Sequence, residues 1–263
     1  MNSPPTPRIL VWNAERKSPR GSVGSRIPTF LARHAPDIVL LTEGEVDLMP
    51  PGGHTMTARP LPFAHLRPNE RRVLAWSREP WTAVEDYQAY EAADPDHPAD
   101  PSEILPGRIV SGTTATSLGP LHVHAVCIPY AFSRVSWGEP RRRTWEDHLA
   151  FLDALVPILT ETPADKPTIV GGDFNNFVPR VKGQKRMPYE RLTAVFAPPW
   201  SIVTAGLTLA SPKGPAHPDK PLIDHLAVNA PLTATAIEGF GNLDHDGQRL
   251  SDHTGCVVTL ARA

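Results

Sequence analysis

The stretch IVGGDFNN, residues 169–176, decides how the rest of the chain is interpreted. Its apolar start predicts a short buried strand, and its two glycines allow the backbone to bend sharply where that strand ends. Asp173 and Asn175 follow two residues apart, so their side chains project the same way and can act on one bound group. An Asx-type turn that closes a strand accounts for the same letters equally well. The choice between a functional site and a structural turn therefore depends on whether other predicted strands also end in polar residues.

The length and composition indicate an ordinary globular protein with many prolines. We expect one domain over residues 1–263, with residues 1–7 flexible and residues 87–106 forming a surface loop. The 31 prolines are roughly double the usual share of about 5%, which predicts long, stiff loops on a compact core. The net charge of −2 gives no global positive field, so contact with nucleic acid would depend on local basic patches.

The cysteines and the N-terminus give an expectation about the compartment. Cys127 and Cys256 lie in apolar runs, which favours buried reduced thiols over a disulfide or a metal pair. No apolar segment has the length of a signal peptide, and none approaches 18 residues. We therefore expect a cytoplasmic protein without membrane insertion, and the sequence indicates no obligate protein partner.

Apolar runs and helical patterns alternate along the chain. We expect strands at residues 8–13, 36–43, 73–77, 222–228 and 256–260, and a hairpin formed by residues 109–116 and 121–128. Helical periodicity is expected at residues 26–34, 144–160 and 188–196. Pro157 should kink the second of these helices or end it early. The rhythm at the start of the chain is similar to a βαβ unit, which indicates an α/β arrangement.

Polar side chains cluster at the ends of the predicted strands. They are Asn13, Glu15, Glu43, Asp173, Asn175, Asp224, Asp252 and His253. Acidic groups in apolar surroundings cost free energy unless their charge is compensated. Carboxylate and amide oxygens, without a thiolate pair or a His-rich set, suit Mg²⁺ or Mn²⁺ better than Zn²⁺. The pattern therefore predicts a divalent-metal site.

Five short motifs, in order along residues 8–260, resemble those of the endonuclease/exonuclease/phosphatase superfamily. This group contains the pancreatic-type deoxyribonucleases and the abasic-site endonucleases. The motifs are Trp12-Asn13-Ala14-Glu15, residues 36–43 ending in Glu43, Gly172-Asp173-Phe174-Asn175, Ile223-Asp224-His225 and Ser251-Asp252-His253. The resemblance implies an α/β (α+β) fold, a four-layer α/β/β/α sandwich of two packed mixed β-sheets with outer helices. It also implies one metal-dependent site at the sheet edges.

The resemblance further implies which residues bind the metal. Glu43 would be the main ligand of Mg²⁺ or Mn²⁺. Asn13, Glu15 and Asp252 would lie close to the metal or to the phosphate.

Catalytic roles are implied for four other residues. Asp173 would activate the attacking water, and Asn175 would orient that water or touch the phosphate. His253 would donate a hydrogen bond to a phosphate oxygen, with its ring held by Asp224. Such a site combines a metal that neutralises the transition state with a carboxylate that deprotonates water.

One position departs from the family pattern. The family usually has a His or Tyr on the strand before a Pro-containing loop, where it contacts the scissile phosphate, and here Cys127 takes that position. His124 lies three residues earlier and should face the other way on a strand. Tyr130, beyond the proline, is a candidate to reach the phosphate. Ordinary packing is the alternative for both.

Basic residues provide further candidates for phosphate contact. They are Arg141, within an Arg-Arg-Arg run, and the loop residues Arg180, Lys182, Lys185 and Arg186. A solvated charged surface is the simpler interpretation of the Arg-Arg-Arg run, whereas the loop directly follows the proposed site, which favours contact with substrate phosphates.

The function expected from the sequence is hydrolysis of a phosphodiester by a Mg²⁺-dependent enzyme, with an endonuclease or exonuclease favoured. The expected partner is a phosphoester substrate, with DNA and RNA among the candidates. A phosphatase or phosphodiesterase that acts on a small or lipid phosphoester is the second hypothesis. A non-catalytic binding scaffold is the third.

Overall fold

The computed structural model describes residues 6–60, 67–87, 104–135, 143–209 and 220–263. Most of the expected surface loop at residues 87–106, the first five residues and Arg141 lie outside these ranges.

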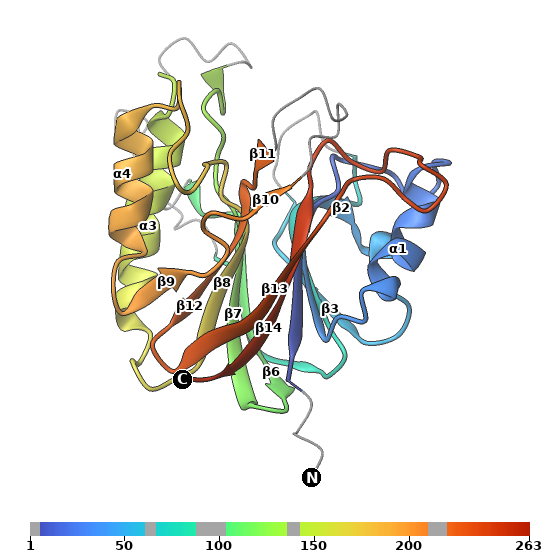
Figure 1. The fold of residues 1–263 in the computed structure, drawn as a ribbon, viewed down its shortest axis with the longest axis horizontal. Coiled ribbons are helices and arrows are strands. Elements are labelled where there is room, and N and C mark those ends of the chain that lie inside the picture. The colour runs from blue at the N-terminus through green and yellow to red at the C-terminus, as the bar shows by residue number, and fades with distance from the viewer. Residues whose placement is uncertain (1–5, 61–66, 88–103, 136–142, 210–219) are drawn as a thin grey trace.

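Two six-stranded sheets pack face to face (Figure 1). The first has the order β13-β14-β1-β2-β4-β3, formed by β13 (Leu232–Phe240), β14 (Gly255–Arg262), β1 (Arg8–Asn13), β2 (Ile38–Glu45), β4 (Glu70–Ser77) and β3 (His54–Thr57). The second has the order β5-β6-β7-β8-β12-β9, formed by β5 (Trp81–Glu85), β6 (Ile109–Thr116), β7 (Gly119–Cys127), β8 (Thr168–Asp173), β12 (Asp224–Asn229) and β9 (Trp200–Ile202). A small pair, β10 (Thr208–Leu209) and β11 (Lys220–Pro221), forms a separate two-stranded sheet.

Each sheet contains one parallel pair among antiparallel neighbours, β1 with β2 and β7 with β8. The carboxyl ends of two parallel strands meet at the same edge of their sheet. Asn13 and Glu43 therefore lie at one edge of the first sheet, and Cys127 and Asp173 lie at one edge of the second.

Helices cover the outer faces of both sheets (Figure 1). They are α1 (Ile27–Arg33) on the first sheet and α3 (Glu146–Glu161) and α4 (Arg186–Val195) on the second, with short 3₁₀ turns η1 (Gly24–Arg26) and η2 (Val46–Leu48). One buried apolar cluster fills the space between the sheets, and two more lie under the helices. The layers are therefore helix, sheet, sheet and helix, which confirms the predicted sandwich.

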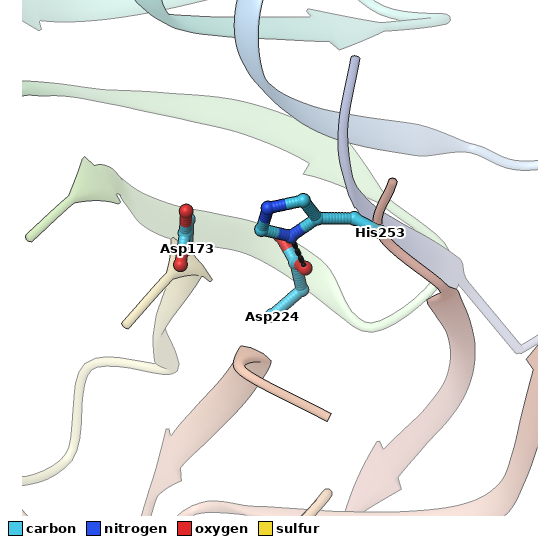
Figure 2. A group of neighbouring side chains, drawn as sticks. All are labelled: Asp173, Asp224 and His253. Atoms are coloured by element: carbon cyan, nitrogen blue, oxygen red, sulfur yellow. Dashed lines mark hydrogen bonds and ion pairs between the residues drawn. The ribbon is translucent and has the colours of Figure 1, made fainter. Parts of the chain in front are cut away.

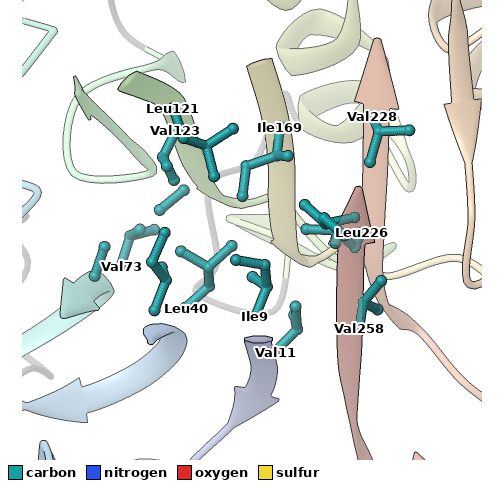
Figure 3. Close-up of a cluster of buried hydrophobic side chains, with 14 of the residues drawn as sticks. Ile9, Val11, Leu40, Val73, Leu121, Val123, Ile169, Leu226, Val228 and Val258 are labelled. Atoms are coloured by element: carbon teal, nitrogen blue, oxygen red, sulfur yellow. The ribbon is translucent and has the colours of Figure 1, made fainter. Parts of the chain in front are cut away.

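The core between the sheets follows from strand alternation (Figure 3). In β1, Ile9 and Val11 face the second sheet, whereas Leu10 and Trp12 face α1. Alternate side chains on one strand point to opposite faces, so a strand buried on both faces has no exposed side. Such a strand appears in the sequence as a continuous apolar run.

One alternative for Pro157 is corrected, and one long strand is not predicted. Pro157 does not end its helix early, because α3 continues to Glu161 and buries Leu159 against the second sheet. The nine-residue β13 is not among the predicted strands, and most of its side chains are exposed at a sheet edge. Its first residues, LTATA, alternate apolar and polar residues, but two of the apolar positions are small alanines and the alternation stops after them, so the strand signal is weak.

Gly172 is the residue that lets β8 deliver Asp173. Its φ is 143°, and a Cβ built on it would overlap the carbonyl oxygen of Val126 on the neighbouring strand. Gly172→Ala is therefore expected to destabilise the protein by about 3 kcal/mol or more, because both the backbone and β7 would have to shift. Chemical denaturation would measure this.

Gly206 is the matched control. Its φ is 82°, but a Cβ added there would meet nothing within 4 Å. Gly206→Ala should cost only about 1 kcal/mol, the ordinary penalty of a left-handed conformation. Equal losses for the two variants would contradict the role given to the contact with Val126.

Candidate active site

The predicted polar residues meet at the edge where β1, β2, β7 and β8 end. In the second sheet, the backbone register aligns Cys127 on β7 with Asp173 on β8, and Asp173 with Asp224 on β12. From the first sheet, His253 comes just before β14, and the Trp12 indole donates a 3.1 Å hydrogen bond to its carbonyl oxygen. The edge therefore joins residues that are far apart in sequence.

Asp173 is a buried carboxylate held by two donors. Its Oδ1 accepts the backbone N–H of Asn175 at 2.8 Å, and its Oδ2 accepts the side-chain Nδ2 of Asn13 at 3.0 Å. Burial, and next the negative charge of Asp224, raise the pKa of Asp173 to about 7. A carboxylate with a pKa near neutrality is well matched to accept a proton from water.

Asp224 and His253 form a close acid–imidazole pair across the two sheets (Figure 2). The Nδ1–H of His253 donates to Asp224 Oδ2 at 2.6 Å. Burial alone would lower the pKa of His253, but the charge and hydrogen bond of Asp224 outweigh it and raise the pKa to about 10. The ring is thus a fixed cation whose Nε2 can donate to an anion.

The Ser251 hydroxyl fixes the segment that carries His253. Its Oγ donates to the carbonyl oxygen of Asn13 at 2.7 Å and accepts the backbone N–H of His253 at 3.0 Å. The serine of the last motif therefore has a structural explanation, since it ties the end of β1 to the segment before β14.

The donor set fits a divalent cation. Ligand atoms of Asp173, Asp224 and His253 lie within 4.8 Å of one another, and Asp224 Oδ1 is a buried oxygen with no hydrogen-bond partner. The protonated ring of His253 offers no lone pair, so the carboxylate oxygens are the groups in this cluster that attract a cation. Two neighbouring buried carboxylates repel each other unless positive charge is present. These observations favour a cation at this edge.

Two of the residues assigned as metal ligands by resemblance lie at the end of β1. Asn13 contacts Asp173 directly, and its Oδ1 accepts the backbone N–H of Glu15 at 2.8 Å. Glu15 forms ion pairs with Lys17 at 2.9 Å and with Arg249 at 3.2 Å.

Glu43 and Asp252 have different surroundings. Glu43 forms an ion pair with Arg72 of β4, and its φ of 53° places it at an irregular point of β2. Asp252 has a half-exposed side chain, and its Oδ1 lies 3.8 Å from His253 Nε2. Among the four assigned ligands, Asn13 therefore has the direct contact with Asp173, and Glu43 is held by an arginine.

Asn175 follows the end of β8 in a left-handed conformation, with a φ of 50°. Asparagine tolerates this conformation better than most residues. Its Nδ2 donates to the carbonyl oxygen of Ile128 at 2.8 Å, which ties the segment after β8 to the segment after β7.

The predicted phosphate-contacting residues are at the surface. Arg180, Lys182, Lys185 and Arg186 are exposed. Gln184 anchors their loop through bonds to the Asn176 side chain and to the carbonyl oxygen of Phe177. Tyr130 is 36% exposed on the segment that follows β7.

Asn176, His148 and His225 form a supporting network, of which only His225 belongs to a motif identified in the sequence. His148 Nδ1–H donates to Pro129 O at 2.8 Å and its Nε2 accepts Asn176 Nδ2 at 3.2 Å, while His225 Nε2–H donates to Asn176 O at 3.1 Å. Burial lowers the pKa of both His148 and His225 to about 4, so both rings are neutral. The sequence signals for this network are His225 in the Ile223-Asp224-His225 motif and the second asparagine of the Asn175-Asn176 pair.

Removal of divalent ions is expected to lower the thermal stability of the protein. In the absence of a cation, the buried carboxylates of Asp173 and Asp224 are compensated by His253 alone within this group of three. Binding to the folded state alone stabilises it by about 2.7 kcal/mol when the ligand is at 100 times its Kd. Thermal melting with millimolar Mg²⁺ and with EDTA would measure the difference, and identical melting temperatures would contradict a cation site here.

Comparison with known proteins connects this edge to a family. The model of the endonuclease/exonuclease/phosphatase family matches residues 10–253. A search of curated protein sequences gives no significant match. Within the described residues, no helix is both long and apolar enough to cross a membrane.

Solved structures share the fold at low sequence identity. An endonuclease/exonuclease/phosphatase from Beutenbergia cavernae is 18% identical with a TM-score of 0.60, over 98% of this chain and 72% of that one. An AP endonuclease from Archaeoglobus fulgidus is 14% identical with a TM-score of 0.64, over 96% and 98%. D. rerio TDP2, complexed with a single-strand DNA product, is 13% identical with a TM-score of 0.62, over 97% and 99%.

The five motifs, the sandwich and the match over residues 10–253 agree with one another. Members of the matching family are hydrolases of phosphoester bonds. This chain belongs to the endonuclease/exonuclease/phosphatase family.

Proposed function

We propose that this protein is a divalent-metal-dependent phosphodiesterase that cleaves nucleic acid by attack of water. The observation that carries the proposal is the juxtaposition of Asp173, a buried carboxylate with a pKa of about 7, with the charged Asp224–His253 pair. One group can accept a proton while the other donates a hydrogen bond to an anion, and both functions promote hydrolysis of a phosphoester.

Each side chain has a defined task in this proposal. Asp173 takes the proton of the attacking water. Hydrogen bonds from the Asn13 side chain and the Asn175 backbone hold the Asp173 carboxylate in place. His253 donates from Nε2 to a non-bridging phosphate oxygen, because Asp224 keeps the ring charged.

Glu43 is the residue that we propose as the main ligand of the cation, with Asn13, Glu15 and Asp252 close to it and Mg²⁺ or Mn²⁺ as the suited ions. When bound, such a cation supplies positive charge that stabilises the phosphate in the transition state.

Nucleic acid is the preferred substrate class because two of the similar structures are an AP endonuclease and a TDP2 bound to a DNA product. The net charge of −2 is the observation that favours the alternative, a small or lipid phosphoester, since no global field attracts a polyanion.

A substrate panel tests the proposal. Purified protein is incubated with supercoiled plasmid, abasic-site DNA, single-stranded RNA and a small aryl phosphodiester, each with Mg²⁺ and with EDTA. Cleavage of a nucleic acid that EDTA abolishes is the expected result. Cleavage of the aryl ester alone would move the assignment to small phosphoesters, and no turnover of any substrate by folded protein would contradict the enzymatic role.

A further inference from the structure

Two buried arginines surround Cys127: Arg108 donates to its carbonyl oxygen, and the charge of Arg72 acts on its thiol. Arg72 lies on β4 and Arg108 immediately precedes β6. Both residues are at least nine-tenths buried, at 9% and 6% exposure. Arginine rarely becomes this buried unless its charge is paired.

Arg108 has no carboxylate partner within ion-pair distance among the described residues. Its guanidinium donates only to neutral oxygens there, from Nη1 to Cys127 O at 3.3 Å and from Nη2 to Ser133 Oγ at 3.2 Å. The carboxylates of Asp147 and Glu43 stabilise the charge of Arg108 electrostatically, but each forms its ion pair with another arginine. Asp147 pairs with Arg134 at 2.7 Å, and Glu43 pairs with Arg72. A buried cation in this state is costly, so its retention calls for an anion that is supplied from outside.

Arg72 is only partly satisfied by its ion pair. It donates from Nη1 to Glu43, while its Nε–H is buried and has no hydrogen-bond partner. A cation bound at Glu43 would compete for this carboxylate and free the guanidinium further. Arg72 thus has an Nε–H donor without an acceptor, and its ion-pair partner Glu43 belongs to the proposed metal site.

Backbone geometry places these groups near Asp173. The N–H of Cys127 donates to the carbonyl oxygen of Arg108 at 2.9 Å, and Cys127 is aligned with Asp173 on the adjacent strand. The charges of Arg72, Arg108, Glu43 and Asp173 all act on the Cys127 thiol, which is consistent with a common location. The thiol itself is buried and neutral, since burial raises its pKa far above the ordinary value.

We propose that Arg72 and Arg108 bind the non-bridging oxygens of the substrate phosphate, and that they replace the His or Tyr whose position Cys127 occupies. A planar guanidinium offers paired N–H donors that match phosphate oxygens, and it remains charged when buried. The proposal rests on the proposed function for the identity of the anion. It makes the site selective for a phosphate that can contact both arginines beside Asp173.

Titration of the metal-free protein with inorganic phosphate in EDTA tests this proposal independently of turnover. Isothermal calorimetry is carried out on the wild type and on Arg72→Met, Arg108→Met and Arg262→Met. Each of the first two variants should bind phosphate at least about tenfold more weakly, because each loses hydrogen bonds to a charged group. Arg262→Met is the control, since Arg262 also donates to a backbone carbonyl, Leu118 O at 2.8 Å, but lies at the far end of β14.

Thermal melting separates a binding role from a structural one. Arg108→Met should melt no lower than the wild type, because it removes an unpaired buried charge and keeps an apolar stem. Arg72→Met should melt lower in EDTA and regain more stability with Mg²⁺ than the wild type does, since it leaves Glu43 without a partner. Arg108→Lys keeps the positive charge but loses the paired N–H donors of the planar guanidinium, so it should bind phosphate with intermediate affinity.

Three results would overturn the proposal. One is unchanged phosphate affinity in both arginine-to-methionine variants, and another is no phosphate binding by the wild type with or without Mg²⁺. The third is loss of folding by both Arg108 variants together with unchanged phosphate binding by Arg72→Met. Arginine-dependent phosphate binding in a protein that hydrolyses no substrate would instead count against the proposed function alone.

Discussion

Asp173→Asn is expected to reduce the turnover of a phosphodiester by about 10²- to 10⁴-fold, the usual range for loss of a general base. Asparagine keeps the shape of the side chain and can still accept the backbone N–H of Asn175, but it cannot take a proton from water. Initial rates at saturating Mg²⁺ would measure the loss. Asp165→Asn, the same change at an exposed position, is the matched control and should retain wild-type rates.

The same substitution is expected to stabilise the metal-free protein above neutral pH. The folded-state pKa of Asp173, about 7, lies above its ordinary value of 3.8, so the folded protein binds this proton more tightly than the unfolded chain does. The contribution of Asp173 to stability therefore falls as the pH rises from about 4 to about 7 and stays reduced above that. Asp173→Asn removes this dependence.

Melting temperatures in EDTA at pH 5 and pH 8 would detect the effect. The wild type should lose more stability between these values than Asp173→Asn does. Equal losses in the two proteins would show that the pKa of Asp173 is not raised by folding, which would contradict its proposed role as the base. A variant that is less active but more stable is expected when the buried charge serves catalysis, whereas removal of a buried charge that serves the fold would lower stability.

The architecture can be predicted because its strands are buried on both faces. Runs such as residues 8–13 and 38–45 are almost entirely buried, and their lengths are those of strands rather than helices. β13 and β3 escape prediction, because edge strands with exposed side chains lack that signal. The expectation that the helix ends early at Pro157 is wrong, because α3 continues to Glu161 and its packing on the second sheet compensates for a missing backbone hydrogen bond.

The site can be predicted where polar residues stand inside apolar strands. Asp173, Asp224 and His253 are identified in this way, and the structure brings all three together. Arg72 and Arg108 are not, because a basic residue at the start of a strand normally indicates an exposed strand end. Only the three-dimensional arrangement shows that both are buried and that the donors of Arg108 meet neutral oxygens. Whether a charged side chain has an oppositely charged partner depends on the three-dimensional arrangement, so the spacing of residues in the sequence does not predict it.

Asp224→Asn is expected to lower turnover by about 10²- to 10⁴-fold as well, through its effect on His253. The 2.6 Å contact keeps the imidazole charged up to a pKa of about 10, against an ordinary value of 6.5. Without the carboxylate, the two largest contributions that raise this pKa are lost and burial lowers it, so a smaller fraction of the rings would be protonated at physiological pH and able to donate from Nε2.

The pH dependence distinguishes this explanation from a loss of structure. A raised histidine pKa contributes stability that is complete below about pH 6.5 and is lost as the pH rises toward 10. Asp224→Asn should therefore lose the decline in melting temperature between these values, and its residual activity should increase as the pH is lowered toward 7, where Asp173 is still able to accept a proton. Asp246→Asn breaks an exposed aspartate–histidine contact, 3.2 Å from His245, and should change neither profile. If Asp224→Asn kept the wild-type pH dependence at a lower overall rate, Asp224 would act on the cation or on the fold and not through His253.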